Sequence, residues 1–138
     1  MTLGALVTLW LGACSGDATG PDVPATPEGS YSLSTIEAKP LPYSMYADTG
    51  YTLEVTSGSL AINSNGKWVS KITSRETVAG NVSTYVDSTF GTWIVAQGAA
   101  TLTNAETSTT SSATWTKADV TVSEVDGSVT LKVVYRKN

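Results

Sequence analysis

The chain contains one cysteine, Cys14, which follows an uncharged apolar stretch at the start of the sequence. Residues 3–11 read LGALVTLWL, and the small residues Gly12 and Ala13 come directly before the thiol. A short apolar run that ends in small residues is typical of a secretory signal peptide and its cleavage site. A single cysteine has no partner for an internal disulfide, so its thiol needs another use in an exported chain. The sequence therefore predicts export of the protein and a covalent modification of Cys14.

The four residues Leu11-Gly12-Ala13-Cys14 resemble the lipobox of bacterial lipoproteins. The resemblance implies that Cys14 becomes the mature N-terminus and is lipidated on sulfur with fatty acyl chains such as palmitate. We therefore expect a lipid-anchored protein of the bacterial cell envelope, and Ser15 after the cysteine is similar to outer-membrane sorting. The first basic residue is Lys39, so the positive region of the signal is expected upstream of Met1. A buried strand or a membrane span stays open for residues 3–11, although a span needs about 20 apolar residues.

Residues 15–28, SGDATGPDVPATPE, contain three prolines, two glycines and no aromatic residue. Such a segment buries too little apolar surface to offset the entropy lost on ordering. The sequence thus predicts a signal peptide over residues 1–13, a lipidated cysteine with a disordered tether over 14–28, and one domain over 29–138.

The composition favours β-structure and argues against nucleic acid as a partner. Charged residues make up 14% of the chain and the formal net charge is −4, so the basic footprint of a nucleic-acid-binding protein is missing. Serine, threonine and valine are abundant, and no segment shows a helical period of apolar residues. An all-β domain is therefore expected.

Apolar and polar residues alternate along several segments that turn-forming residues separate. The clearest alternation runs over residues 129–136, and a long strand is expected over 82–95. Asn65-Gly66 predicts a type I′ hairpin, because both positions of that turn need positive φ. Joining each strand to the next by a turn gives an antiparallel meander of about eight strands, which can close into a small barrel or a half-barrel.

The order of features over residues 29–137 resembles that of small bacterial lipocalin-like lipoproteins. The features are Gly29-Ser-Tyr31, Leu41-Pro42, Gly58-Ser-Leu60 before the Asn-Gly hairpin, Gly91-Thr-Trp93, and the closing Val134-Tyr135-Arg136-Lys137. The resemblance implies a lipocalin-like barrel. In true lipocalins a Gly-x-Trp motif lies on the first strand, whereas Gly91-Thr92-Trp93 lies far into this chain, so no ligand-binding role follows for it.

The sequence predicts no catalytic residues, no metal site and no cofactor. The chain has no histidine, which removes the usual general base and the commonest zinc ligand. Glu124 and Asp126 are the closest carboxylate pair, but they flank a predicted turn, where such pairs are usually solvated. An enzyme is therefore not expected.

The remaining expectation is a binding role. Trp68, Trp93, Trp115 and Tyr135 could line a pocket for a small apolar ligand, or they could be core and rim residues of a small barrel. The leading hypothesis is a monomeric, membrane-anchored envelope lipoprotein that binds such a ligand or an envelope protein. The alternative is a structural or protein-interaction module with a filled core and no ligand. A closed interior cavity would favour the first hypothesis, and a solid core with exposed apolar surface would favour the second.

Overall fold

The computed structural model describes residues 23–126 and 128–138 of the chain. The described residues form ten β-strands and no helix. The strands are β1 (Gly29–Ile36), β2 (Lys39–Pro40), β3 (Tyr43–Asp48), β4 (Tyr51–Ile62), β5 (Lys67–Val78), β6 (Asn81–Ala96), β7 (Ala99–Asn104), β8 (Thr110–Trp115), β9 (Asp119–Asp126) and β10 (Val129–Lys137).

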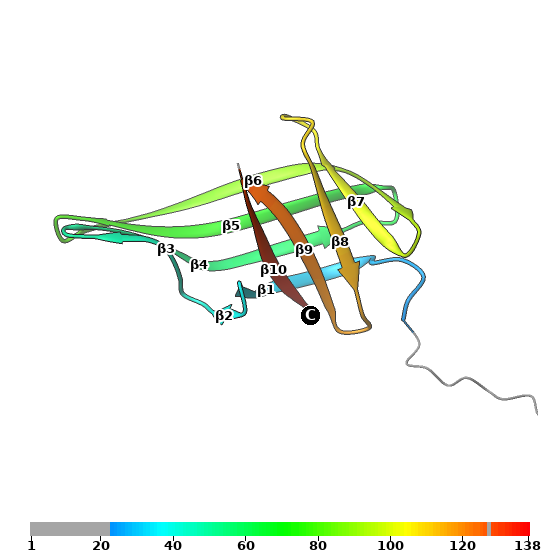
Figure 1. The fold of residues 1–138 in the computed structure, drawn as a ribbon, viewed down its shortest axis with the longest axis horizontal. Coiled ribbons are helices and arrows are strands. Elements are labelled where there is room, and N and C mark those ends of the chain that lie inside the picture. The colour runs from blue at the N-terminus through cyan, green and yellow to red at the C-terminus, as the bar shows by residue number, and fades with distance from the viewer. Residues whose placement is uncertain (1–22, 127) are drawn as a thin grey trace, which may run out of the picture.

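Eight of these strands form a closed antiparallel barrel, as the sequence predicts (Figure 1). From β4 to β10 each strand pairs with the next one in the chain, and β1 closes the ring by pairing with both β10 and β4. Tyr31 of β1 lies opposite Leu60 of β4 and Lys137 of β10. The first strand therefore has no free edge within the barrel, because the last strand covers it.

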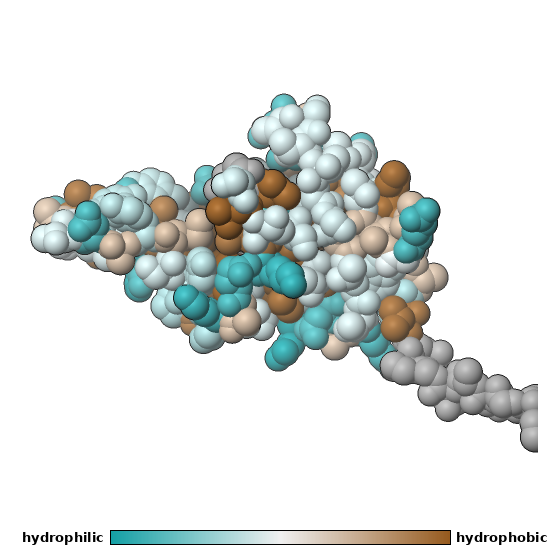
Figure 2. Space-filling view, in the orientation of Figure 1, coloured by the Kyte–Doolittle hydropathy of each residue, from teal (hydrophilic) through white to brown (hydrophobic). Residues whose placement is uncertain are grey.

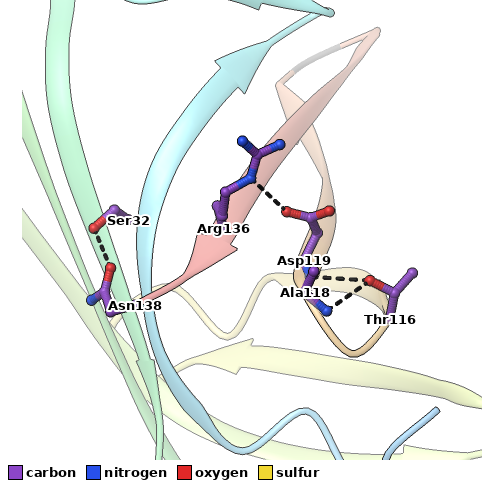
Figure 3. A network of polar contacts seen from close by, with 6 residues as sticks. All are labelled: Ser32, Thr116, Ala118, Asp119, Arg136 and Asn138. Carbon is purple, nitrogen blue, oxygen red and sulfur yellow. Dashed lines mark hydrogen bonds and ion pairs between the residues drawn. The ribbon is translucent and has the colours of Figure 1, made fainter. Parts of the chain in front are cut away.

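Polar contacts hold the closing strands together (Figure 3). The hydroxyl of Ser32 donates to the side-chain carbonyl of Asn138 at 2.6 Å, which ties the end of the chain to β1. Arg136 of β10 pairs with Asp119 of β9 at 3.3 Å. The Thr116 hydroxyl accepts hydrogen bonds from the backbone N–H groups of residues 118 and 119, which fixes the turn before β9.

The barrel interior is filled by side chains. Alternate residues of the strands point inward and form one cluster, whose fully buried members include Leu60, Ile62, Val120 and Tyr135. The complete set of buried apolar residues is Tyr31, Leu33, Ile36, Val55, Leu60, Ile62, Trp68, Ala100, Leu102, Ala113, Val120, Val122, Val133 and Tyr135. An eight-stranded barrel has an interior just wide enough for side chains, and here they occupy it.

Strands β4, β5 and β6 are longer than the other strands of the barrel. They contain 12, 12 and 16 residues, whereas β7 has only six. Because β6 pairs with β7 only over residues 91–96, most of its first ten residues extend beyond the barrel together with the parts of β4 and β5 nearest the β4–β3 and β5–β6 turns. With β3 at the outer edge, these parts form a four-stranded extension, here called the arm, which projects to the left in Figure 1.

The hairpin between β4 and β5 differs in one respect from the predicted one. Ile62 lies opposite Trp68, which is the register expected from the inward face of β5. The type I′ prediction is wrong: Gly66 has a φ of +75°, but Asn65 is not among the residues with positive φ. The loop is longer than two residues, because the Asn63 N–H donates to the Lys67 carbonyl across it. A four-residue loop needs the left-handed conformation at its glycine only.

Candidate functional site

The four residues predicted to line a pocket do not meet in one cavity. Trp68 and Tyr135 lie inside the barrel, with 8% and 2% of their surfaces exposed. Trp93 donates its indole N–H to the Asn63 carbonyl, and Trp115 donates its own to the Pro24 carbonyl. The last two are half-buried and pack against the edge of the same core, with their indole N–H groups bonded at the β4–β5 loop and at the segment that precedes β1. Cys14, the predicted lipidation site, lies outside the described residues.

The segment before β1 covers the end of the barrel opposite the arm (Figure 1). Pro24 accepts the Trp115 indole N–H at 2.7 Å, and Pro27 is fully buried. The carbonyl of Pro27 accepts a hydrogen bond from the buried Tyr31 hydroxyl at 2.7 Å. The chain therefore enters the fold at one end of the barrel, while the arm leaves from the other.

Two small hollows open at the end of the barrel from which the arm projects. One, of about 190 Å³, lies between Trp68, Leu102 and the loop that follows β7. The other, of about 140 Å³, lies between Met45 of β3 and Tyr135 of β10. Glu124 borders both hollows. Pockets for small molecules usually measure about 300–1,000 Å³, so neither hollow is a cavity for a lipocalin-type ligand.

Glu124 is a candidate site residue that the sequence analysis considered only as half of a solvated carboxylate pair. It follows Val120 and Val122 on β9, and its place in that alternation aims it into the mouth of the barrel. Desolvation beside the two hollows raises the pKa of its carboxyl group, although the residue as a whole remains exposed at the mouth. The alternation Val-x-Val-x-Glu was the signal in the sequence for this direction, and the solvent exposure that the nearby Asp-Gly turn suggested is present as well.

Tyr135 forms the polar base of the mouth. Burial raises the pKa of its hydroxyl to about 12; the hydroxyl group of Ser70 lowers that pKa and the charge of Glu124 raises it further. The two hydroxyl oxygens of Ser70 and Tyr135 lie 3.4 Å apart. The mouth therefore offers the neutral phenol of Tyr135, the hydroxyl of Ser70 and the carboxylate of Glu124.

The inner face of the arm, defined as the face continuous with the barrel interior, carries a group of tyrosines around one glutamate. Strand pairing places Tyr46, Leu53, Glu76 and Ser83 side by side across the four strands. The row toward the tip contains Asp48, Tyr51, Val78 and Asn81, and the row toward the barrel contains Tyr43, Val55, Ser74 and Tyr85. The register alone thus gathers aromatic side chains from three strands on one surface.

Side-chain contacts confirm this grouping. The Tyr85 hydroxyl donates to the Glu76 carboxylate at 3.0 Å, and the rings of Tyr46 and Tyr51 have centroids 5.5 Å apart. The pKa of Tyr51 is raised chiefly by a hydrogen bond with Glu76, and the nearby Tyr85 and Tyr46 add to this effect. Tyr46 and Tyr85 expose about half of their surfaces, so the group is open to a partner.

Charge is sorted between the two faces of the arm. The inner face carries the carboxylates Asp48, Glu76 and Asp87, and the described inward positions of β3–β6 include no lysine or arginine. The cations of β5 lie on the outer face: these are Lys67, Lys71 and Arg75, the last paired with Glu54 at 2.6 Å. The inner face therefore combines aromatic rings with uncompensated negative charge, a combination that attracts cationic groups.

A wider cleft of about 550 Å³ lies on the outer surface, where β6 meets β7. Val69, Phe90 and Ala105 give it apolar walls, and Lys67 contributes the one charged side chain of its lining. Its volume lies within the range of small-molecule pockets. It is the second candidate site.

The described residues meet the requirements neither of a metal site nor of a membrane-spanning helix. Within residues 23–126 and 128–138, no three histidine, cysteine, aspartate or glutamate side chains come close enough to hold a metal ion. No helix in this part of the chain is long and apolar enough to cross a membrane. Comparisons with protein-family models, with curated proteins and with solved structures give no match.

Proposed function

We propose that this protein is a lipid-anchored envelope lipoprotein whose arm binds a basic segment of another envelope protein. The observation that carries the proposal is the inner face of the arm, where Tyr46, Tyr51 and Tyr85 surround Glu76 and the described inward positions of β3–β6 hold no lysine or arginine. Lysine and arginine side chains bind such surfaces through ion pairs and through the faces of aromatic rings. The protein is then a non-enzymatic interaction module.

The filled barrel favours the hypothesis of an interaction module over the hypothesis of a barrel that binds a ligand inside. The interior is occupied by core side chains, and the hollows at its mouth measure only about 190 and 140 Å³. A small apolar ligand of the lipocalin kind would need several core side chains to move. A side chain of a partner protein is small enough for the 140 Å³ hollow, where Glu124 would meet a positive charge.

The position of the arm suits an anchored module. Val23–Glu28 reaches the barrel at the end remote from the arm (Figure 1). An anchor on Cys14 would therefore hold the opposite end of the barrel at the membrane and leave the arm facing away from it. The proposal also includes a lipocalin-like relationship and an outer-membrane location. Both are supported by the sequence features described above.

Direct binding of a basic peptide tests the proposal. The lipidated protein, solubilised in detergent, is titrated with a fluorescent lysine-rich peptide and with a glutamate-rich peptide of equal length. We expect saturable binding of the basic peptide only, weakening as salt rises. Equal binding of both peptides, or of neither, would contradict the proposal.

Charge removal at one residue locates the binding surface. Glu76→Gln removes the central carboxylate and should weaken binding about three- to fivefold, in line with up to about 1 kcal/mol for one exposed charge pair. Glu106→Gln, on the exposed loop after β7, is the matched control and should leave the affinity unchanged. Equal effects of the two changes would indicate non-specific attraction.

The outer cleft supports a second candidate function, the binding of a small apolar ligand outside the barrel. Its volume of about 550 Å³ and the apolar walls formed by Val69 and Phe90 favour it. The probe 1-anilinonaphthalene-8-sulfonate should then bind saturably at one site, and Phe90→Ala should reduce that binding. Probe binding that does not saturate, or that is unchanged by Phe90→Ala, would exclude the cleft as the binding site.

A further inference from the structure

One edge of the arm has no strand beside it. Residues 81–89 of β6 pair with β5 on one side, and β7 begins to pair with β6 only at Gly91. No other strand of the described chain pairs with this stretch. The opposite edge of the arm, β3, is six residues long and has a register shift between Ser44 and Tyr46. Short strands and irregular register protect an edge, and β6 has neither protection.

The free edge carries one charged side chain, Asp87, which lies on the inner face. Between Asn81 and Phe90 there is no lysine, arginine or proline, and pairing with β5 runs without a register shift. The outward side chains of Val82 and Val86 are 61% and 62% exposed, and that of Phe90 is 49% exposed. A long, regular edge with exposed apolar side chains is a template for pairing with another strand.

The direction of the backbone groups follows from two hydrogen bonds at the end of this stretch. The Phe90 carbonyl accepts from the Ala105 N–H on the β7 side, and the Trp93 N–H donates to the Gly66 carbonyl on the β5 side. Backbone groups alternate between the two sides of an antiparallel strand. The N–H and C=O groups of residues 84, 86 and 88 therefore point to the free edge.

We propose that two copies of this chain pair antiparallel through the free edge of β6, with Val86 of one copy opposite Val86 of the other. In this register Val82 lies opposite Phe90 and Thr84 lies opposite Ser88 on the outer face. Tyr85 lies opposite Asp87 on the inner face, so the two aspartates are not placed against each other. The two arms join into one continuous sheet that carries both inner faces.

The self-complementarity of the sequence identifies a second copy as the occupant. Apolar residues meet apolar residues and hydroxyl residues meet hydroxyl residues, which stabilises cross-strand pairs. A slip by two residues would place Val82 opposite Ser88 and Thr84 opposite Val86. Centring the pair on Ser88 instead would extend it into residues that β7 already occupies. The Val86-centred register combines the longest free ladder with matched side chains.

Sedimentation equilibrium of the lipidated full chain, in density-matched detergent, tests the proposal. We expect a monomer–dimer equilibrium that Val86→Lys shifts toward monomer by about tenfold or more in dissociation constant, because two ammonium groups would then face each other. The matched control is Thr73→Lys, since Thr73 lies opposite Val86 on β5, on the same face but away from the edge. A wild-type protein that stays monomeric at all concentrations would overturn the proposal, as would equal effects of the two substitutions.

Amide hydrogen exchange of the wild-type protein gives a second readout that needs no substitution. Exchange at residues 84, 86 and 88 should slow as protein concentration rises, because these N–H groups become bonded only in the dimer. Exchange at residues 85 and 87 should be slow at every concentration, since β5 bonds these groups within one chain. A dimer in which residues 84, 86 and 88 keep exchanging freely would show that another surface forms it. Neither measurement uses a basic peptide, so failure of the dimer and failure of the proposed function are distinguishable.

Discussion

Gly91 of β6 lies so close to Thr103 of β7 that a Cβ on residue 91 would come within 1.8 Å of the Thr103 carbonyl oxygen. The same carbonyl accepts a hydrogen bond from the Trp68 indole N–H at 3.3 Å, and the Thr92 carbonyl accepts one at 3.0 Å. The close approach therefore seats a core tryptophan at the point where β6 enters the barrel.

Gly91→Ala should destabilise the protein by about 1–3 kcal/mol, because backbone atoms cannot rotate away from the added methyl group. Gly98→Ala is the control: Gly98 has a φ of +78° and no atom within 4 Å of the added Cβ, so only backbone strain is introduced. Urea unfolding followed by tryptophan fluorescence measures both. A smaller loss for Gly91→Ala than for Gly98→Ala would show that the two strands separate readily.

Tyr135 should make stability fall at high pH. Its pKa of about 12 in the folded state lies above the usual value of 10, so the folded protein holds a proton that the unfolded chain releases. The stabilisation is present in full below pH 10 and is lost as the pH rises from 10 to 12, by about 2–3 kcal/mol. Urea midpoints at pH 9 and pH 12 for the wild type and Tyr135→Phe measure it. An equal fall in both proteins would assign the effect to other groups.

Glu124→Gln should stabilise the protein at neutral pH. Burial raises the pKa of this carboxyl group, so its ionised form is the unfavourable one in the fold. Stability contributed by the protonated form is present at acid pH and is lost as the pH rises through the folded-state pKa. The melting temperature of Glu124→Gln should exceed that of the wild type at pH 7 and match it near pH 3. The opposite order at pH 7 would mean that the carboxylate has a stabilising partner.

A chain that ends after Gly127 should not fold cooperatively. The deletion removes β10, which pairs with both β1 and β9 and contributes buried Val133 and Tyr135. Each large apolar side chain contributes about 1.5–3 kcal/mol when buried, against a total stability of about 5–15 kcal/mol for a typical domain. Circular dichroism during heating checks this. A sharp transition near the wild-type temperature would mean that the barrel closes without its last strand.

Cys14→Ser should release the protein from the membrane. The change removes the sulfur on which the acyl chains would be carried, and each buried methylene contributes about 0.8 kcal/mol to anchoring. Fractionation of cells and the intact mass of the purified protein measure the outcome, with Ser15→Ala as the neighbouring control. If the wild-type protein carries no added mass at residue 14, the lipid-anchor part of the proposed function is wrong.

The sequence by itself determined the local elements. The alternation over residues 129–136 identified the last strand and its buried residues Val133 and Tyr135, although Val129 is exposed. Asn65-Gly66 located a hairpin whose register the structure confirms. Both signals are local, because side-chain alternation and turn chemistry act over a few residues. The predicted type of that turn was wrong. The turn type depends on the length of the loop, which is set by where the pairing between β4 and β5 ends.

Only the tertiary structure decided where the barrel stops and the arm begins. The alternation of residues 82–95 predicted a strand correctly, but it contains nothing that separates the half beside β7 from the half with a free edge. The length of β7 sets that boundary, and it places Val82 and Val86 in solvent. The direction of Glu124, the burial of Trp68 and the half-buried position of Trp115 at the edge of the core were decided in the same way. Barrel closure depends on pairing between distant strands, and such pairing leaves no local pattern in the sequence.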